Sequence, residues 1–342
     1  MTPKERIYAI LNGDPYDRPA VTPIFMAWAA NYIRRSYRDY YLDGDVLVEA
    51  QLAVTKAFNL DQISTISDPW REAAGYGMEF NYPQDGVGKP KDCLIKSLQD
   101  ISNLKPLDIE NCDRMKQRVE SVARLVAEIG QTHSVLGWVE GPFAEYADLC
   151  GVEKALLSLM DEPEMFLEAT KVITANAIAF ALAQVRAGAD MIGIGDAAAG
   201  LIGPDLYVKY ALPAEQQLVS AIHQAGASVK LHICGNINHI IQHMAKSGAD
   251  IIDVDWIVPL GEARKLVGPE ITLCGNFDPS AVLLQAGPED VAEAAKQCID
   301  TGGEKFILMP GCEVPPVTPE QNIRAFCPCD GCLIRKELGV EI

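Results

Sequence analysis

Residues 164–196 read EMFLEATKVITANAIAFALAQVRAGADMIGIGD, and this stretch contains one complete helix-to-strand unit. The segment from Glu164 to Ala187 has the apolar spacing of an amphipathic helix. Gly188-Ala189-Asp190 then supplies turn residues, and Met191 to Ile194 is an apolar run of the length expected for a buried strand. We therefore expect a helix, a tight turn and a strand in succession, with Asp196 close behind the strand.

The same alternation recurs along the whole chain. Short β-branched or apolar runs, each followed by a helical pattern, mark eight candidate strands. These are Val21 to Met26, Gln62 to Ile66, Ser134 to Val139, Met191 to Ile194, Ser228 to Ile233, Ile251 to Val254, Ile271 to Leu273 and Lys305 to Leu308. The clearest helical stretches between them are 112–129, 164–187, 204–225, 237–247 and 288–301. Eight such units predict an α/β fold, a (β/α)8 TIM barrel. An open doubly wound sheet would usually carry a glycine-rich phosphate loop after its first strand, and the sequence has none there.

We expect one domain over residues 1–342, because neither a linker nor an internal repeat interrupts the alternation elsewhere. Residues 76–97 do break it, since they contain Asn81 and, close together, Pro83, Gly86, Gly88 and Pro90, and they predict an inserted hairpin or lid after the second strand. Residues 327–342 form a cysteine-rich C-terminal tail with three cysteines in six residues. Reduced thiols in a loop are the expectation for the tail, and a second metal site is the alternative.

Composition narrows the classes of function. The net charge of -18 disfavours nucleic-acid partners, because phosphate backbones are bound by clustered lysine and arginine. Apolar runs such as 173–183 end well before the roughly 18 residues that a membrane span requires, so we expect no membrane helix. The first residues lack the pattern of an export signal. Ten cysteines then indicate reduced thiols and a cytoplasmic protein rather than a disulfide framework.

Polar side chains follow the predicted strands at their C-terminal ends, where barrel enzymes carry their chemistry. In chain order they are Asn31, Asp68, Glu140, Asp196, His232 with Cys234, Asp255, Asn276, and Cys312 with Glu313. We expect the carboxylates Glu140, Asp68 and Asp196 to be catalytic. Two interpretations stay open for Asp255 and Asn276, because such residues either contact a bound cofactor or cap the following helices.

The heptapeptide KLHICGN at residues 230–236 carries the pattern His-x-Cys. Residues two apart on a strand face the same side, so His232 and Cys234 point together. Imidazole nitrogen and thiolate sulfur are preferred zinc ligands, and a catalytic zinc site needs only three protein ligands. Cys312 follows the eighth predicted strand and can reach the same barrel mouth. The three residues predict a metal site, and the alternative is a packed histidine beside buried thiols.

Six short motifs, spread over most of the chain, carry a resemblance to a known family. They are Asp17-Arg18-Pro19, Ile66-Ser67-Asp68, Gly141-Pro142-Phe143, His232-Ile233-Cys234-Gly235-Asn236, Gly275-Asn276-Phe277-Asp278-Pro279 and Pro315-Pro316-Val317-Thr318-Pro319-Glu320-Gln321-Asn322. In this order they resemble the uroporphyrinogen decarboxylase superfamily of (β/α)8 barrels. Single motifs of this kind are weak, and their shared order makes the resemblance specific.

The resemblance points to one branch of that superfamily. Its decarboxylases carry arginines after the first strand that clamp the substrate carboxylates, whereas residues 25–32 here read FMAWAANY. They also carry a histidine where this sequence has Cys312. A histidine-x-cysteine on the fifth strand with a cysteine after the eighth is similar to the zinc methyltransferases that work with corrinoid proteins, such as methylcobamide:coenzyme M methyltransferase. The resemblance implies that His232, Cys234 and Cys312 bind zinc.

The resulting hypothesis is methyl transfer between a corrinoid (cobalamin), carried by a partner protein, and a small thiol or methylated substrate. If the methyl donor is an ether, an acid must protonate the leaving group, and Glu140, Asp68 or Glu313 could serve. Two other classes of protein stay open. One is a metal-free decarboxylase-like lyase using Asp68 and Asp196, and the other is a binding module with a structural zinc closed by Glu313 or His239.

Overall fold

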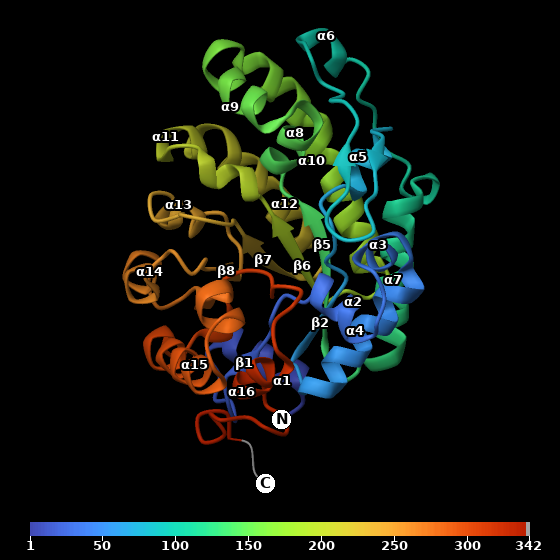
Figure 1. The fold of residues 1–342 in the computed structure, drawn as a ribbon. Helices are drawn as coiled ribbons and strands as arrows, with labels where there is room; N and C mark the ends of the chain where they lie inside the picture. Colours follow the sequence, from blue (N-terminus) through green and yellow to red (C-terminus); the bar gives the residue numbers. More distant parts are fainter. Residues whose placement is uncertain (340–342) are drawn as a thin grey trace.

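Eight parallel strands form the centre of the molecule, and helices surround them (Figure 1). The structure is a computed structural model and describes residues 1–339. The hydrogen-bonded strand order is β1-β10-β9-β8-β7-β6-β5-β2. The amide of Asp61, directly before β2, donates to the carbonyl of Val21 in β1 at 3.1 Å, which brings the two ends of the sheet together. The predicted (β/α)8 barrel is confirmed.

The barrel strands are β1 (Ala20–Val21), β2 (Gln62–Ser64), β5 (Ser134–Glu140), β6 (Met191–Gly195), β7 (Ser228–His232), β8 (Ile251–Asp253), β9 (Thr272–Phe277) and β10 (Phe306–Pro310). The α-helices are α1 (Pro3–Asn12), α2 (Ala27–Tyr32), α3 (Tyr37–Leu42), α4 (Gly44–Phe58), α5 (Arg71–Gly75), α6 (Leu98–Ile101), α7 (Asp113–Ile129), α8 (Pro142–Cys150), α9 (Val152–Asp161), α10 (Pro163–Arg186), α11 (Pro204–Leu206), α12 (Leu212–Gln224), α13 (Ile241–Met244), α14 (Leu260–Val267), α15 (Pro288–Gly302) and α16 (Glu320–Phe326). Short 3₁₀ turns are η1 (Ile109–Asn111) and η2 (Ala197–Leu201), and π-helical turns are η3 (Tyr207–Ala211) and η4 (Pro279–Leu284).

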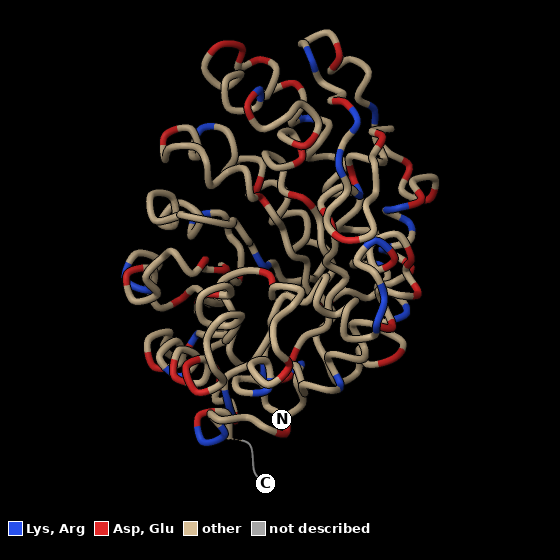
Figure 2. Tube along the Cα trace, viewed as in Figure 1, with Lys and Arg blue, Asp and Glu red and all other residues tan. Residues whose placement is uncertain are grey.

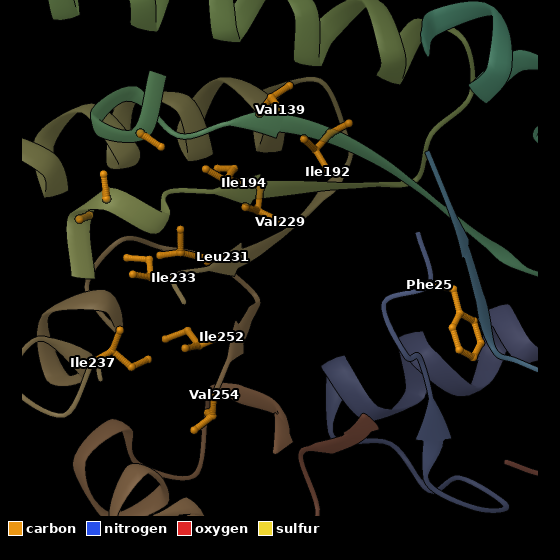
Figure 3. Packing of buried hydrophobic residues seen from close by; sticks show 14 of the residues in the cluster. Phe25, Val139, Ile192, Ile194, Val229, Leu231, Ile233, Ile237, Ile252 and Val254 are labelled. Carbon is orange, nitrogen blue, oxygen red and sulfur yellow. The ribbon is translucent and has the colours of Figure 1, made fainter. Parts of the chain in front are cut away.

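Each strand divides its side chains between two cores. Val229 and Leu231 of β7, like Ile252 of β8, face the layer between the strands and the outer helices (Figure 3). The alternate positions face the barrel interior, which is filled by a separate cluster that includes Trp138 and Met309. Because alternate residues of a strand share a face, the inward residues at the strand ends open toward the barrel mouth.

Along the chain, β2 and β5 are separated by an antiparallel pair of short strands, β3 (Phe80–Asn81) and β4 (Lys89–Pro90). This pair confirms the predicted hairpin. The indole nitrogen of Trp70 donates to the carbonyl of Gly88 at 2.8 Å, so the hairpin is held at the C-terminal side of β2. Whether it acts as a lid remains a prediction. In the tail predicted over 327–342, residues 340–342 lie outside the described part of the chain.

Several predicted element boundaries were wrong for identifiable reasons. The first strand ends at Val21 rather than Met26, because Pro23 lacks the amide that a strand ladder needs. The helix predicted over 204–225 is divided into α11, η3 and α12, since Pro213 removes one helical hydrogen bond and produces the π turn. Strand β9 runs from Thr272 to Phe277, beyond the predicted end at Leu273.

The helix α10 is long and apolar enough to cross a membrane by length and composition alone, with a mean hydropathy of 1.4 over its most apolar window. Half of that window is buried inside the structure, where the helix packs against β5, α8 and α12. An outer-layer helix of a barrel meets the same criterion, so packing accounts for its apolar character.

Candidate metal centre

The three predicted ligands converge at the barrel mouth. His232 is the last residue of β7, Cys234 lies two residues further on, and Cys312 comes from the loop after β10. Nε2 of His232 lies 2.9 Å from Sγ of Cys234 and 3.9 Å from Sγ of Cys312. The two sulfurs are 3.8 Å apart, which matches the separation of about 3.8 Å that two thiolates have on a tetrahedral zinc. Within residues 1–339 this is the one cluster of metal-binding side chains.

The electrostatics of the cluster favour a thiolate. The hydrogen bond from Cys234 lowers the pKa of the Cys312 thiol to about 4, whereas the same bond raises the pKa of Cys234. Burial lowers the pKa of His232, but the neighbouring thiols and a carboxylate outweigh it, so the net shift is well upward. Without a metal the cluster therefore pairs a Cys312 thiolate with a protonated imidazole, and a bound cation would take the place of the protons. A soft divalent metal fits this nitrogen and sulfur donor set.

One carboxylate orients the histidine. Oδ2 of Asp253, the last residue of β8, lies 3.0 Å from Nδ1 of His232, and the two residues are paired in the register of β7 and β8. This contact places the proton on Nδ1 and leaves Nε2 free to bind a metal, as in the carboxylate–histidine pairs of zinc proteins. The sequence reasoning missed Asp253 in favour of Asp255, although strand alternation placed both on one face.

No fourth protein ligand joins the cluster among the described residues. Oε1 of Glu313 accepts a hydrogen bond from the backbone amide of Ala27 at 3.2 Å. His239 contacts the carbonyl of Ile202 at 2.9 Å and is turned away from the ligands. The arrangement therefore leaves the fourth position of a tetrahedral metal available to a substrate.

The two residues predicted to contact a cofactor hold backbone in place instead. Oδ2 of Asp255 accepts from the amide of Gly235 at 2.8 Å, which fixes the chain directly after Cys234. The side-chain nitrogen of Asn276 donates to the carbonyl of Val258 at 2.6 Å. Neither contact caps the helix that follows the residue, because the N-cap residues there are Pro259 and Asp278, so helix capping and a cofactor contact both stay predictions.

Two of the predicted catalytic carboxylates are paired with arginines, the half-buried Arg114 and the buried Arg71. Asp68 forms an ion pair with Arg114 at 2.5 Å, and Glu140 forms one with Arg71 at 2.6 Å. Burial raises the pKa of Glu140 to about 8 despite the arginine, because other carboxylates crowd the same arginine. Glu140 ends β5 two residues after the inward-facing Trp138, so it lies at the mouth, where its raised pKa favours uptake of a proton.

The third predicted catalytic carboxylate, Asp196, is fully buried. Its oxygens accept from the amides of Ala144 at 2.6 Å and Phe143 at 3.5 Å, both in the first turn of α8. The carboxylate thus acts as an anchor for the N-terminus of that helix. These contacts favour a positioning role, and catalysis by Asp196 stays a prediction.

The tail cysteines are not part of the centre. Cys327 and Cys332 are buried, Cys329 is half-buried, and all three are free thiols. The carbonyl of Pro328 accepts from the side chain of Asn59 at 3.0 Å, which ties the tail to α4. Within residues 1–339 the tail provides no cluster of three metal ligands, in agreement with a loop of reduced thiols.

Comparison with known proteins finds one family and two kinds of named relatives, methyltransferases and decarboxylases. Residues 2–329 match the model of the uroporphyrinogen decarboxylase (URO-D) family. The chain is 29% identical over 346 residues to the methylcobamide:CoM methyltransferase MtbA of Methanosarcina acetivorans, covering 96% of this chain and 97% of that protein. It is 31% identical over 337 residues to the uroporphyrinogen decarboxylase of Crocosphaera subtropica, covering 92% of each. A methyltransferase from Methanosarcina mazei has the same fold, with a TM-score of 0.87 and 24% identity over 95% of this chain and 97% of that one.

Proposed function

The chain belongs to the uroporphyrinogen decarboxylase family, and from this premise we propose that it is a zinc-dependent methyltransferase. It would move a methyl group between a corrinoid carried by a partner protein and a small thiol or methylated substrate. The observation that carries the proposal is the convergence of His232, Cys234 and Cys312 within 4.8 Å of one another. Relatives named as methyltransferases and as decarboxylases match about equally well, so the site residues have to decide between the two.

Some residues of the site would bind the zinc, and others fix the position of those that bind it. Zinc bound by His232, Cys234 and Cys312 would supply a Lewis acid that activates a substrate thiol or polarises a methylated heteroatom. Asp253 fixes the imidazole, and Asp255 fixes the chain after Cys234. The ring of Trp138 lies 6.2 Å from the imidazole between centroids and is part of the buried cluster in the barrel interior.

A leaving group that departs as an anion would need a proton, and two of the predicted acids, Glu140 and Glu313, have raised pKa values that favour holding one. Burial raises the pKa of Glu140 to about 8 and that of Glu313 to about 7, whereas Arg114 lowers the pKa of Asp68 against the effect of burial. We propose Glu140 as the general acid when the substrate is a methyl ether. If the substrate is a thiol acceptor, no such acid is required.

The residues of α2 speak against the decarboxylase alternative. The resemblance implies arginines after the first strand in the decarboxylases, whereas at this place the present chain has Ala27, which is buried, and Asn31, whose side chain donates to the carbonyl of Pro316. Two arginines that follow β2, the buried Arg71 and the half-buried Arg114, already pair with Glu140 and Asp68. A substrate carboxylate that reached either of these two arginines would thus meet a paired guanidinium group.

Zinc content and methyl transfer test the proposal together. We expect about one zinc per chain in the wild type, and most of it lost in Cys312→Ser, measured by elemental analysis under reducing conditions. Cys329→Ser is the matched control, because it removes a half-buried thiol outside the cluster. Transfer from methylcobalamin to small thiols, followed by the cobalamin absorbance, should require zinc.

Three outcomes separate the possible classes of protein. A folded wild type without metal would overturn the methyltransferase and return the metal-free lyase to first place. Zinc without any methyl transfer would support a structural zinc. Loss of zinc in Cys329→Ser would move the metal to the tail. We further propose a cytosolic location, because the thiols of the site must stay reduced.

A further inference from the structure

A lysine lies in the interior of the barrel, where most neighbours are apolar. Lys230 in β7 is only 2% exposed. It precedes His232 by two residues, so both side chains point to the same side of the strand. A charged ammonium at such a position is unfavourable unless another charge pairs with it.

The contacts of Lys230 show what pairs with it. Its Nζ lies 3.2 Å from Oδ1 of Asp253 and 3.6 Å from the sulfurs of Cys274 and Met309. Sulfur is a weak acceptor, so the carboxylate is the main partner. Asp253 is fully buried, and in the described chain its Oδ1 accepts no hydrogen bond from another residue. The two charges therefore depend on each other.

We propose that Lys230 is a positioning residue of the metal centre. It holds Oδ1 of Asp253 from the barrel side, so Oδ2 stays on Nδ1 of His232 and Nε2 stays directed at Cys234. The chain of contacts is Lys230, Asp253, His232 and then the metal. This inference rests on the proposed metal site.

Packing alone does not account for a lysine here. A methionine would fill a similar volume beside Cys274 and Met309 without any charge to compensate. A buried ion pair gains little stability over apolar residues of the same size. Its specific consequence is geometric, because a carboxylate held by Lys230 on one oxygen cannot rotate away from His232. Outer contacts of this kind tune metal affinity.

The test is metal binding, measured apart from activity. Wild type, Lys230→Met, Asp253→Asn and the double variant are loaded with Co²⁺, and affinity is measured by chelator competition alongside the visible Co²⁺–thiolate absorption. We expect Lys230→Met and Asp253→Asn each to weaken metal binding by about 10- to 100-fold and to shift the Co²⁺ bands. The double variant should be no weaker than Asp253→Asn alone, because Lys230 acts through Asp253.

Cys274→Ala is the matched control, because it removes another contact of Lys230 while keeping both charges. It should lower the melting temperature and leave Co²⁺ affinity and spectrum unchanged. Equal affinity and spectrum in wild type and Lys230→Met would overturn this inference while the metal site stands. A wild type that binds no Co²⁺ or zinc would overturn both. If Lys230→Met does not fold, the double variant decides, and binding weaker than that of Asp253→Asn contradicts the proposal.

Discussion

At the scale of the residue, two carboxylates on one face of the β8 end serve two different ligands. Asp253 contacts the ring of His232, and Asp255 contacts the backbone directly after Cys234. The first contact sets which ring nitrogen is free, whereas the second sets where the thiol stands. A metal site needs both, because a ligand displaced by an ångström no longer completes the coordination geometry.

We expect Asp255→Ala to weaken zinc binding by about tenfold while the fold stays intact, because the Gly235 amide loses its acceptor and the chain after Cys234 loosens. The measurement is zinc affinity by chelator competition, with circular dichroism as a check on folding. Asp278→Ala is the control, because Asp278 accepts from the Ser280 amide at 2.7 Å in the same manner and lies in another loop. Equal losses in both variants would contradict a local role for Asp255.

The sequence singled out the three side chains that cluster at the barrel mouth but not the residues that support them, for reasons that lie in the residues themselves. His232, Cys234 and Cys312 are chemically distinctive, so their spacing was enough to single them out. Lys230 and Asp253 are common residues, and their pairing depends on the register of β7 against β8. Since a shift of one residue would send Asp253 to the other face, the pairing could not be derived without the structure.

At the scale of the element, the inner face of α8 adds two carboxyl groups to an already acidic cluster. Glu145 is buried there and Asp148 is half-buried, close to Glu72 of α5 and to Glu140 at the end of β5. Neither side-chain oxygen of Glu145 has a hydrogen-bond partner among the described residues. Burial raises the pKa of Glu145 well above its ordinary value, and the neighbouring carboxylates add to the shift.

The cluster should make stability depend on pH. Below about pH 4, Glu145 is protonated in both the folded and the unfolded chain and contributes no slope. At higher pH the unfolded chain releases the proton and the folded chain keeps it. The free energy of unfolding therefore falls as pH rises, by up to about 1.4 kcal/mol per pH unit.

We expect Glu145→Gln to raise the melting temperature at pH 8 and to change it little at pH 5, because glutamine carries no proton to lose. Thermal unfolding of both proteins across this range is the measurement. Glu153→Gln on the exposed face of α9 is the control and should keep the wild-type slope. A parallel shift of the two pH profiles would contradict a Glu145 carboxyl that stays protonated in the folded chain.

Two loops bring the ligands together, and a glycine precedes or follows a ligand in each. A Cβ on Gly311 would lie 2.3 Å from the backbone nitrogen of Trp256, so the loops after β8 and β10 approach too closely for any other residue. Gly235 has a φ of 83° with open space around it, so only its backbone conformation favours glycine.

We expect Gly311→Ala to destabilise by about 1–3 kcal/mol and to reduce zinc content, because the loop that carries Cys312 must move. Gly235→Ala should cost only about 1 kcal/mol, from its left-handed backbone. Urea unfolding and zinc analysis of both variants are the measurements. Gly235→Ala as the more damaging change would show that backbone conformation matters more than the loop contact.

The positions of the strands could be predicted from the sequence, whereas the boundaries of several helices could not. Apolar runs located all eight strands because each is buried on both faces and therefore continuous in hydrophobicity. The helix that Pro213 interrupts was predicted as continuous, since its apolar periodicity passes through the π turn. Of the helix predicted over 237–247, only α13 forms. Before α13, the side chain of Asn236 accepts a hydrogen bond from the Asn238 amide, and this contact keeps the start of the segment in a turn.

At the scale of the whole molecule, acidic and basic residues are scattered over all parts of the trace (Figure 2). Large apolar side chains are exposed on loops that follow barrel strands. They are Val87, Leu201, Trp256, Ile257 and Val317, which come after β2, β6, β8 and β10. Single exposed apolar residues are ordinary, but these share the end of the barrel that holds the metal centre. We call them the apolar rim.

The apolar rim has a specific consequence if a corrinoid protein is the partner. A methyl group carried by that protein reaches the metal centre only when the two proteins meet at the barrel mouth. Apolar side chains around the mouth would then be buried in the complex, and a charge placed there would oppose association. The rim should therefore matter for a carrier protein more than for free methylcobalamin.

We expect Val317→Asp to raise the KM for the corrinoid protein by about tenfold or more, because Val317 is 74% exposed beside the loop of Cys312 and its burial would be replaced by that of a charge. The same variant should change transfer from free methylcobalamin far less. Leu266→Asp is the matched control, since Leu266 is 47% exposed at the C-terminal end of α14, near the opposite end of the barrel. Both variants are assayed with the carrier protein and with the free cofactor. Equal loss with the two methyl donors would place the effect in the active site, and no loss with either would mean that the partner docks elsewhere.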